Sequence, residues 1–169
     1  MFGIQKIGVT MIILPSAYFG STEYWTAIVK GGEDTVIDLG ENYVKRSERN
    51  RTEIMTSGGV MQLSVQLAHA NRPRQAMRSM RIDYSKRWQH QHLVAMESAY
   101  RNSPYYDYFA DRFTPLFAKE WKWLVDLNMA TLEGVCSVLK IAVPRISAQY
   151  IAASEGDIDL RDKRRGSTF

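Results

Sequence analysis

Apolar and polar positions divide the chain into a strand-rich first half and a helical second half. Residues 7–14 and 35–39 are rich in Val and Ile and predict two buried strands. Between them, Ser21 is placed to cap a helix that runs to about Lys30 and stops at the following Gly pair. This order predicts a parallel pair of strands joined by a crossover helix.

Residues 52–67 have the pattern of a β-hairpin. A Ser-Gly-Gly turn at 57–59 separates 52–56 from 60–67, and alternating Met61, Leu63, Val65 and Leu67 predict one buried face. Residues 77–83 predict a further short strand.

Helical spacing dominates the second half. One helix places Trp88, His92 and Met96 on a single face, and Ser103-Pro104 predicts the start of the next. Residues 120–139 predict the longest helix, and 146–151 a last strand. We therefore expect an α+β fold, with a small mixed sheet from the N-terminal half packed against helices from the C-terminal half.

The length of 169 residues suits one domain, which we expect to span residues 1–154. Residues 155–169 are charged and have almost no apolar content, so we expect a poorly ordered tail. The run at 7–14 is too short to span a bilayer and lacks the flanks of a signal peptide. With Cys136 in an apolar helical run, an inert core thiol and a cytoplasmic location are expected.

Positive charge is concentrated in residues 45–87, which hold ten Lys or Arg against three acids, a local charge of +7. Such a band favours an anionic partner, although a solvated basic face explains it equally well. Within it, Lys45, Arg49 and Arg51 could clamp a phosphate or carboxylate, with Asn50 as a neutral donor and acceptor. The alternative is that Lys and Arg protect a strand edge from aggregation. Glu41 could pair with Lys45 or orient a donor.

His92 is the candidate acid or base, because imidazole titrates near neutral pH. Its helix face is otherwise apolar, so a buried core histidine is the competing interpretation. Tyr18, Tyr43 and Tyr100 could stack on a sugar ring, or could be core residues. No Cys/His cluster has zinc spacing, and no nucleotide-binding glycine loop is present, so we expect neither metal nor cofactor.

Six blocks of this sequence resemble the WbqC-like family in order and spacing. They are Leu14-Pro15-Ser16-Ala17-Tyr18-Phe19, Glu41-Asn42-Tyr43-x-Lys45, Arg49-Asn50-Arg51, Trp88-x-x-x-His92, Ala99-Tyr100 and Ser103-Pro104-Tyr105. The resemblance covers about residues 7–151. Relatives usually continue beyond the block Asp159-Leu160-Arg161 with an aromatic and leucine-rich segment that this chain lacks. An uncovered apolar patch, filled by a partner or by self-association, is therefore expected near the first strand or the last helix.

Some members of this family are encoded with genes for O-antigen or other surface polysaccharides. The resemblance implies a metal-independent transferase that moves an aminoacyl group, glycine, to a nucleotide-linked or lipid-linked amino sugar. His92 would deprotonate the attacking group, while the clamp holds an anionic small molecule or nucleotide sugar. The alternative is a non-catalytic module that binds an anion, nucleic acid or a partner enzyme, with nucleic acid ranked below a small anion. A concave pocket that holds both the clamp and His92 would favour an enzyme, and a flat basic face a binding module.

Overall fold

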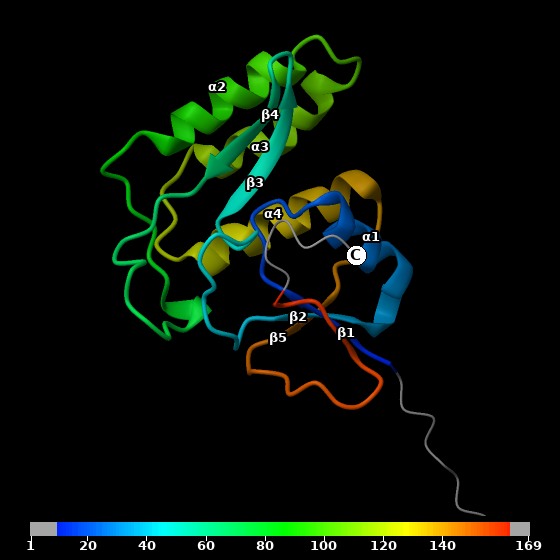
Figure 1. Ribbon diagram of the computed structural model, residues 1–169. Helices are drawn as coiled ribbons and strands as arrows, with labels where there is room; N and C mark the ends of the chain where they lie inside the picture. The colour runs from blue at the N-terminus through cyan, green and yellow to red at the C-terminus, as the bar shows by residue number, and fades with distance from the viewer. Residues whose placement is uncertain (1–9, 163–169) are drawn as a thin grey trace, which may run out of the picture.

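The computed structural model describes residues 10–162 and shows helices and two sheets in one body (Figure 1). The strands are β1 (Ile12–Pro15), β2 (Thr35–Asp38), β3 (Arg51–Thr56), β4 (Gly59–Ser64), β5 (Arg145–Ser147) and β6 (Ile158–Asp159). The helices are α1 (Thr22–Gly31), α2 (Trp88–Tyr100), α3 (Tyr106–Phe117) and α4 (Leu124–Leu139), with 3₁₀ turns η1 (Gly32–Asp34) and η2 (Met77–Ser79).

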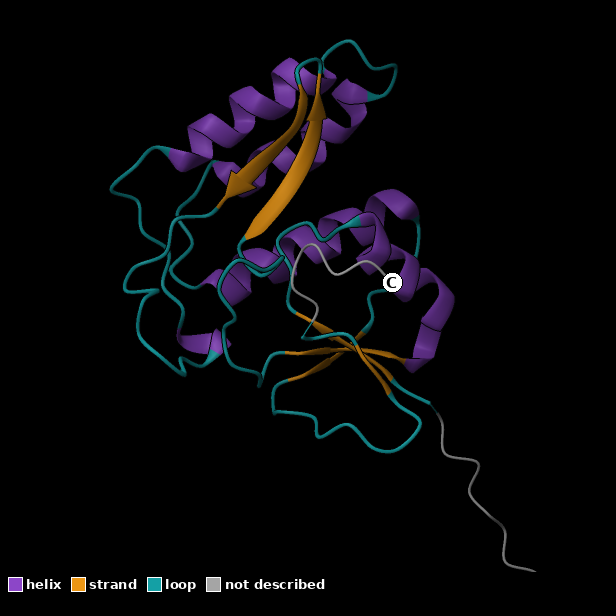
Figure 2. Cartoon of the chain, viewed as in Figure 1, coloured by secondary structure: helices purple, strands orange, loops and turns teal. Residues whose placement is uncertain are grey.

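The larger sheet has four short strands in the order β5-β2-β1-β6, and every neighbouring pair is parallel. The hairpin of β3 and β4 is a separate antiparallel ribbon, which lies at the other end of the molecule (Figure 2). Parallel and antiparallel pairing therefore coexist with four helices, and the predicted α+β class is confirmed. The larger sheet also includes β5 and β6, which come from the C-terminal part of the chain.

The crossover between β1 and β2 follows the predicted local signals. The side chain of Ser21 accepts a hydrogen bond from the backbone N–H of Tyr24, and Gly32, at φ 51°, ends α1. Tyr24 and Ile28 of α1 pack with Leu132 and Cys136 of α4 in a core that covers the sheet. Cys136 is 1% exposed, as expected for a core thiol.

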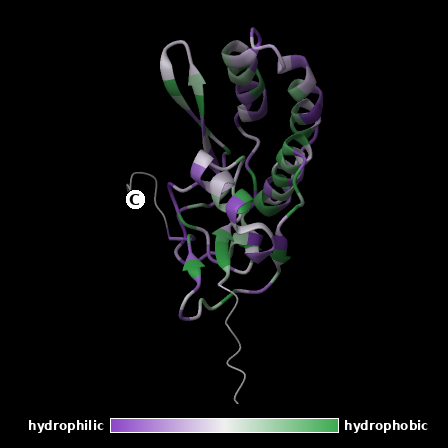
Figure 3. Ribbon diagram, turned by 90° about the vertical axis from the view of Figure 1, so that its right-hand side faces the viewer, coloured by the Kyte–Doolittle hydropathy of each residue, from purple (hydrophilic) through white to green (hydrophobic). Residues whose placement is uncertain are grey.

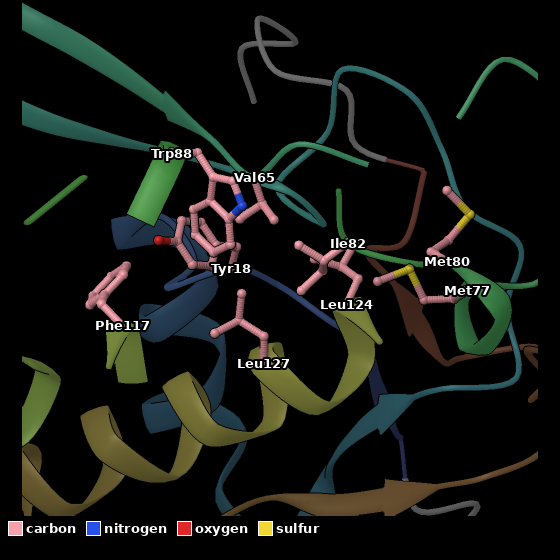
Figure 4. Close-up of a cluster of buried hydrophobic side chains, with 9 residues drawn as sticks. All are labelled: Tyr18, Val65, Met77, Met80, Ile82, Trp88, Phe117, Leu124 and Leu127. Atoms are coloured by element: carbon pink, nitrogen blue, oxygen red, sulfur yellow. The ribbon is translucent and has the colours of Figure 1, made fainter. Parts of the chain in front are cut away.

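A second core joins the hairpin base to the three later helices (Figure 4). It consists of Tyr18, Val65, Met77, Met80, Ile82, Trp88, Phe117, Leu124 and Leu127. This cluster fixes the loops that flank the hairpin, because their apolar side chains are embedded in it.

Three local predictions were wrong. Residues 77–83 contain η2 and isolated bridges instead of a strand, and α3 begins at Tyr106 without a side-chain cap. On β4 only Leu63 is buried, while Met61 remains 45% exposed. The reason is geometric, since the hairpin projects past the core and most side chains of β4 are not covered by another element (Figure 3).

The expected tail also differs. Within the described residues after 154, Ile158–Asp159 forms β6 beside β1, and Arg161 is 5% exposed. Charged residues are ordered here because Arg161 makes ion pairs with Asp38 and Asp159. The rest of the predicted tail, residues 163–169, lies outside the described part of the chain.

An apolar hollow of about 810 Å³ lies where an uncovered patch was expected, between the start of β1 and the segment after α4. Met11, Val29, Ile141 and Val143 are among the residues that line it. What occupies this hollow stays a prediction.

Candidate anion-binding site

Two loops and the base of the hairpin form a polar cleft. Backbone hydrogen bonds join Tyr43 N–H to the carbonyl of Gln75 and Val65 N–H to the carbonyl of Asn50, each at 2.8 Å. An isolated bridge between Asn42 and Ala76 adds to this pairing. The segment after β2 and the segment after β4 are therefore held face to face.

The cleft has a volume of about 390 Å³, which is in the range of small-molecule sites. Four of the residues predicted from the sequence line it, namely Tyr43, Lys45, Asn50 and Arg51. The other lining residues are Arg46, Ser64, Val65, Gln66, Leu67, Ala70 and Asn71.

Three cations converge on this cleft, and none of its described lining residues is a carboxylate. The buried ion pairs among residues 10–162 are made by Arg49 and Arg161, and none of them includes Lys45, Arg46 or Arg51. Lys45 Nζ donates only a long hydrogen bond, 3.4 Å, to Asn71 Oδ1. The Nε of Arg51 is buried and lacks a hydrogen-bond partner among the described residues. Its Nη1 donates a long hydrogen bond, 3.5 Å, to Gln62 Oε1. Guanidinium and ammonium groups that lie in a concave site without a carboxylate in its lining favour an anionic ligand.

The backbone of Arg46 is in the left-handed region, at φ 57°. A non-glycine residue costs about 1–3 kcal/mol in sparsely populated regions of this kind, which occur often at ligand sites. The loop therefore holds this cation at the cleft against its backbone preference.

The side chain of Asn50 connects the two segments that form the cleft. Its Nδ2 donates to the carbonyl of Val65 at 3.0 Å, and its Oδ1 accepts from the Tyr43 hydroxyl at 2.9 Å. Burial raises the pKa of Tyr43, so its hydroxyl stays protonated and can donate this bond. Both polar ends of Asn50 are thus used in positioning the loops.

Arg49 lies apart from Lys45 and Arg51, the two other residues of the predicted clamp, because it does not line the cleft. It is 1% exposed, and its Nε donates to Glu41 Oε1 at 2.9 Å while Nη2 contacts Glu41 Oε2. Nη2 also donates to the carbonyl of Arg161 at 2.9 Å. Burial raises the pKa of Glu41, and the bonds from Arg49 oppose that rise. The sequence suggested that the guanidinium of Arg49 binds a substrate. In the structure its donors are used by Glu41 and by the carbonyl of Arg161.

Sequence reasoning missed the buried charges beside this pair. Arg161 Nη1 contacts Asp38 Oδ2, and its Nε donates to Asp159 Oδ1 at 2.8 Å. The sequence did contain one signal for a buried charge. Asp38 is an acid that directly follows apolar residues at the carboxyl end of a predicted strand. A charge there needs a partner if the sheet buries it.

His92 lies in the aromatic core and not in the cleft. It is 3% exposed, its ring packs against Trp88 and Phe117, and its Nδ1 lies 2.8 Å from the Tyr18 hydroxyl. Burial lowers the pKa of His92 to about 4, so the imidazole is neutral at pH 7. His92 therefore does not share the cleft with Lys45 and Arg51, because its apolar helix face turns toward the core.

The two other predicted tyrosines also lie elsewhere. Tyr18 is 0% exposed, and burial raises its pKa. Tyr100 is 38% exposed and accepts a hydrogen bond from the Met55 backbone N–H at 3.1 Å. Neither ring lines the cationic cleft.

Residues 10–162 show no arrangement typical of a metal site or of a membrane span. No group of three or more acidic, His or Cys side chains is arranged to bind a metal ion there. No helix of that range combines the length and apolarity needed to cross a bilayer.

Comparison with known proteins assigns the chain to a family. The WbqC-like protein family matches residues 16–163, and the chain belongs to that family. An uncharacterized protein of Mycobacterium tuberculosis (strain ATCC 25618 / H37Rv), Rv1507c, is 30% identical over 131 residues. That match covers 77% of this chain and 56% of the relative. No solved structure matches the chain.

Proposed function

We propose that the cationic cleft binds the phosphate or carboxylate group of a small anionic substrate. One observation carries the proposal: Lys45, Arg46 and Arg51 face one concave space, and its described lining residues include no carboxylate. Amide groups of Asn71 and Gln66 add neutral donors at the rim.

A nucleotide-linked sugar is the substrate class that we propose for this cleft. The family resemblance implies work on surface polysaccharides, whose sugar donors and acceptors carry phosphates. A volume of about 390 Å³ accepts a diphosphate with part of its sugar or nucleoside. Transfer of an aminoacyl group to an amino sugar rests on the resemblance alone, since the described lining residues include no carboxylate or imidazole.

A non-catalytic anion-binding module is the second candidate. The position of His92 favours it, because the expected general base is buried outside the cleft. The cleft is nonetheless concave, which favours a small molecule over the extended backbone of a nucleic acid.

Calorimetric titration with inorganic phosphate, uridine diphosphate and a uridine-diphosphate amino sugar tests the binding proposal. Replacing Lys45 or Arg51 by Ala should weaken binding about tenfold or more, since each charge-assisted bond contributes about 1.5–3 kcal/mol. Lys86→Ala is the matched control, because Lys86 is exposed in the same basic band but outside the cleft. Equal binding by all variants would refute the site.

Mass spectrometry separates the two candidates. A transferase should add one glycyl group to the amino sugar when an activated glycine is supplied, and Arg51→Ala should slow that addition. Tight binding of the sugar nucleotide without any product from a panel of glycyl donors would favour the binding module.

A further inference from the structure

A second cavity opens between α2, α3 and α4, away from the cationic cleft. Its volume is about 440 Å³, and its walls are formed mainly by Phe19, Leu93, Met96, Phe109, Phe113 and Val138. These side chains are half-buried, so they pack on the core on one side and leave an apolar surface open on the other. We call this cavity the helical groove.

The helical groove offers few hydrogen bonds. Apart from backbone atoms, its polar groups are the hydroxyls of Tyr100, Ser103, Tyr106 and Thr114. The Tyr100 hydroxyl already accepts a bond from the backbone of the hairpin. An extended peptide would bring N–H and C=O groups that could not be satisfied there, at a substantial cost for each one buried.

A groove of about 440 Å³ is too small to enclose a helix of a partner protein, which could insert only the side chains of one face. An α-helix with side chains is about 10–12 Å across and rises about 5.4 Å per turn, so a single turn needs a space on the order of 500 Å³. A hydrocarbon chain is narrow, flexible and free of hydrogen-bonding groups. It is therefore the ligand class that the size and lining of the groove fit.

The surface beside the groove points to the source of that chain. Tyr100 lines the groove and contacts Met55 of β3, which pairs with Val60 of β4. Met55 is 61% exposed and Val60 is 62% exposed, on a hairpin that projects from the body (Figure 3). Tyr105, in the loop between α2 and α3, is 69% exposed. Exposed aliphatic side chains next to tyrosines are typical of a protein surface that meets the interface between water and lipid.

We propose that the helical groove binds the hydrocarbon chain of a membrane lipid, with the tip of the β3–β4 hairpin at the lipid surface. This inference is independent of the anion-binding proposal, because no residue lines both cavities.

Titration with alkyl glucosides below their micelle concentrations tests the groove. These neutral compounds avoid attraction to the cationic cleft. Affinity should rise about three- to fourfold for each added methylene from butyl to octyl, as expected for burial of a hydrocarbon chain. An affinity that does not change with chain length would overturn the proposal.

Ala110→Trp should fill the groove from α3 and weaken octyl glucoside at least tenfold. The matched control is Ala118→Trp, because Ala118 is exposed at the end of the same helix and outside the groove. Circular dichroism shows whether each variant is folded. If Ala110→Trp does not fold, Val138→Asn carries the test, because it places an amide in the same wall without filling it. Undiminished binding by a folded groove variant would refute the site.

Sedimentation with neutral phosphatidylcholine vesicles tests the hairpin tip. Wild type should sediment with the vesicles, and Val60→Ser should reduce the bound fraction severalfold. Val143→Ser, an exposed valine outside the groove and the hairpin, should not. Absence of vesicle binding would overturn the membrane part of the proposal.

Sedimentation that shows a dimer of wild type and a monomer of Ala110→Trp would assign the groove to a second copy of the chain instead.

Discussion

The hydroxyl of Tyr18 and Nδ1 of His92 lie 2.8 Å apart with both side chains buried, which joins the segment after β1 to helix α2. The imidazole is neutral because burial lowers its pKa from 6.5 to about 4. In the unfolded chain the same group titrates near its ordinary value. Between these two values the unfolded state binds more protons, so stability falls as the pH falls.

The first prediction is an acid-sensitive free energy of unfolding. From about pH 6.5 down to about pH 4, His92 should remove on the order of 3 kcal/mol of stability. His92→Asn should lack this component, and His90→Gln, at an exposed position on the same helix, should keep it. Urea unfolding at pH 7 and pH 4.5 measures the difference. Identical pH profiles for wild type and His92→Asn would show that His92 is not held neutral by the fold.

The second prediction separates two neighbouring arginines. Arg49→Ala should destabilise the protein by about 3–5 kcal/mol, because Glu41 is left buried without its partner. Arg51→Ala should change stability by about 0.5 kcal/mol or less, since this side chain faces the cleft. Chemical denaturation measures both. The double variant Arg49→Met/Glu41→Leu should recover most of the loss, and failure to recover would mean that Arg49 acts through contacts other than this ion pair.

The third prediction concerns the loop after β2. A Cβ at Gly40 would lie 1.9 Å from the backbone N of Tyr150 and 2.3 Å from the carbonyl carbon of Gln149. Gly40→Ala should therefore displace backbone and cost about 1–3 kcal/mol, as overpacking usually does. Gly58→Ala is the control, because its Cβ would meet only Thr56 Oγ1 at 3.8 Å. Thermal melts that rank these two variants in the opposite order would contradict the close approach of the two segments.

The fourth prediction concerns the segment after residue 154. A chain that stops after residue 154 should lose β6 and the Arg161 ion pairs, and unfold at clearly lower urea concentration than wild type. A chain that stops after residue 162 keeps both and should retain most of the stability. Equal midpoints for the two truncations would mean that β6 and Arg161 contribute little.

Local signals in the sequence predicted local structure well. Ser21 and Gly32 bound α1 because a cap and a glycine stop act within a few residues. The hairpin turn at 57–59 was likewise identified from its own residues. Met61 was misjudged because its burial depends on whether another element covers it, which the alternation along β4 does not reveal.

The candidate site was predictable only in part. Lys45 and Arg51 were identified by residue type and position, and both line the cleft. Arg49 has the same chemistry, yet its environment depends on Arg161, which is 112 residues away along the chain. Asn71 and Gln66 line the cleft because two loops pair with each other. The residues next to them in the sequence do not predict this pairing.

The position of β6 also has a consequence for folding during synthesis. Asp38 contacts a counter-ion, Arg161, that is made 123 residues later. At about 5–20 residues per second, the nascent chain carries Asp38 without that partner for on the order of ten seconds. Throughout that interval the edge of β1 that later pairs with β6 is open to other strands. Until β6 emerges, this edge of β1 has no strand partner from its own sheet.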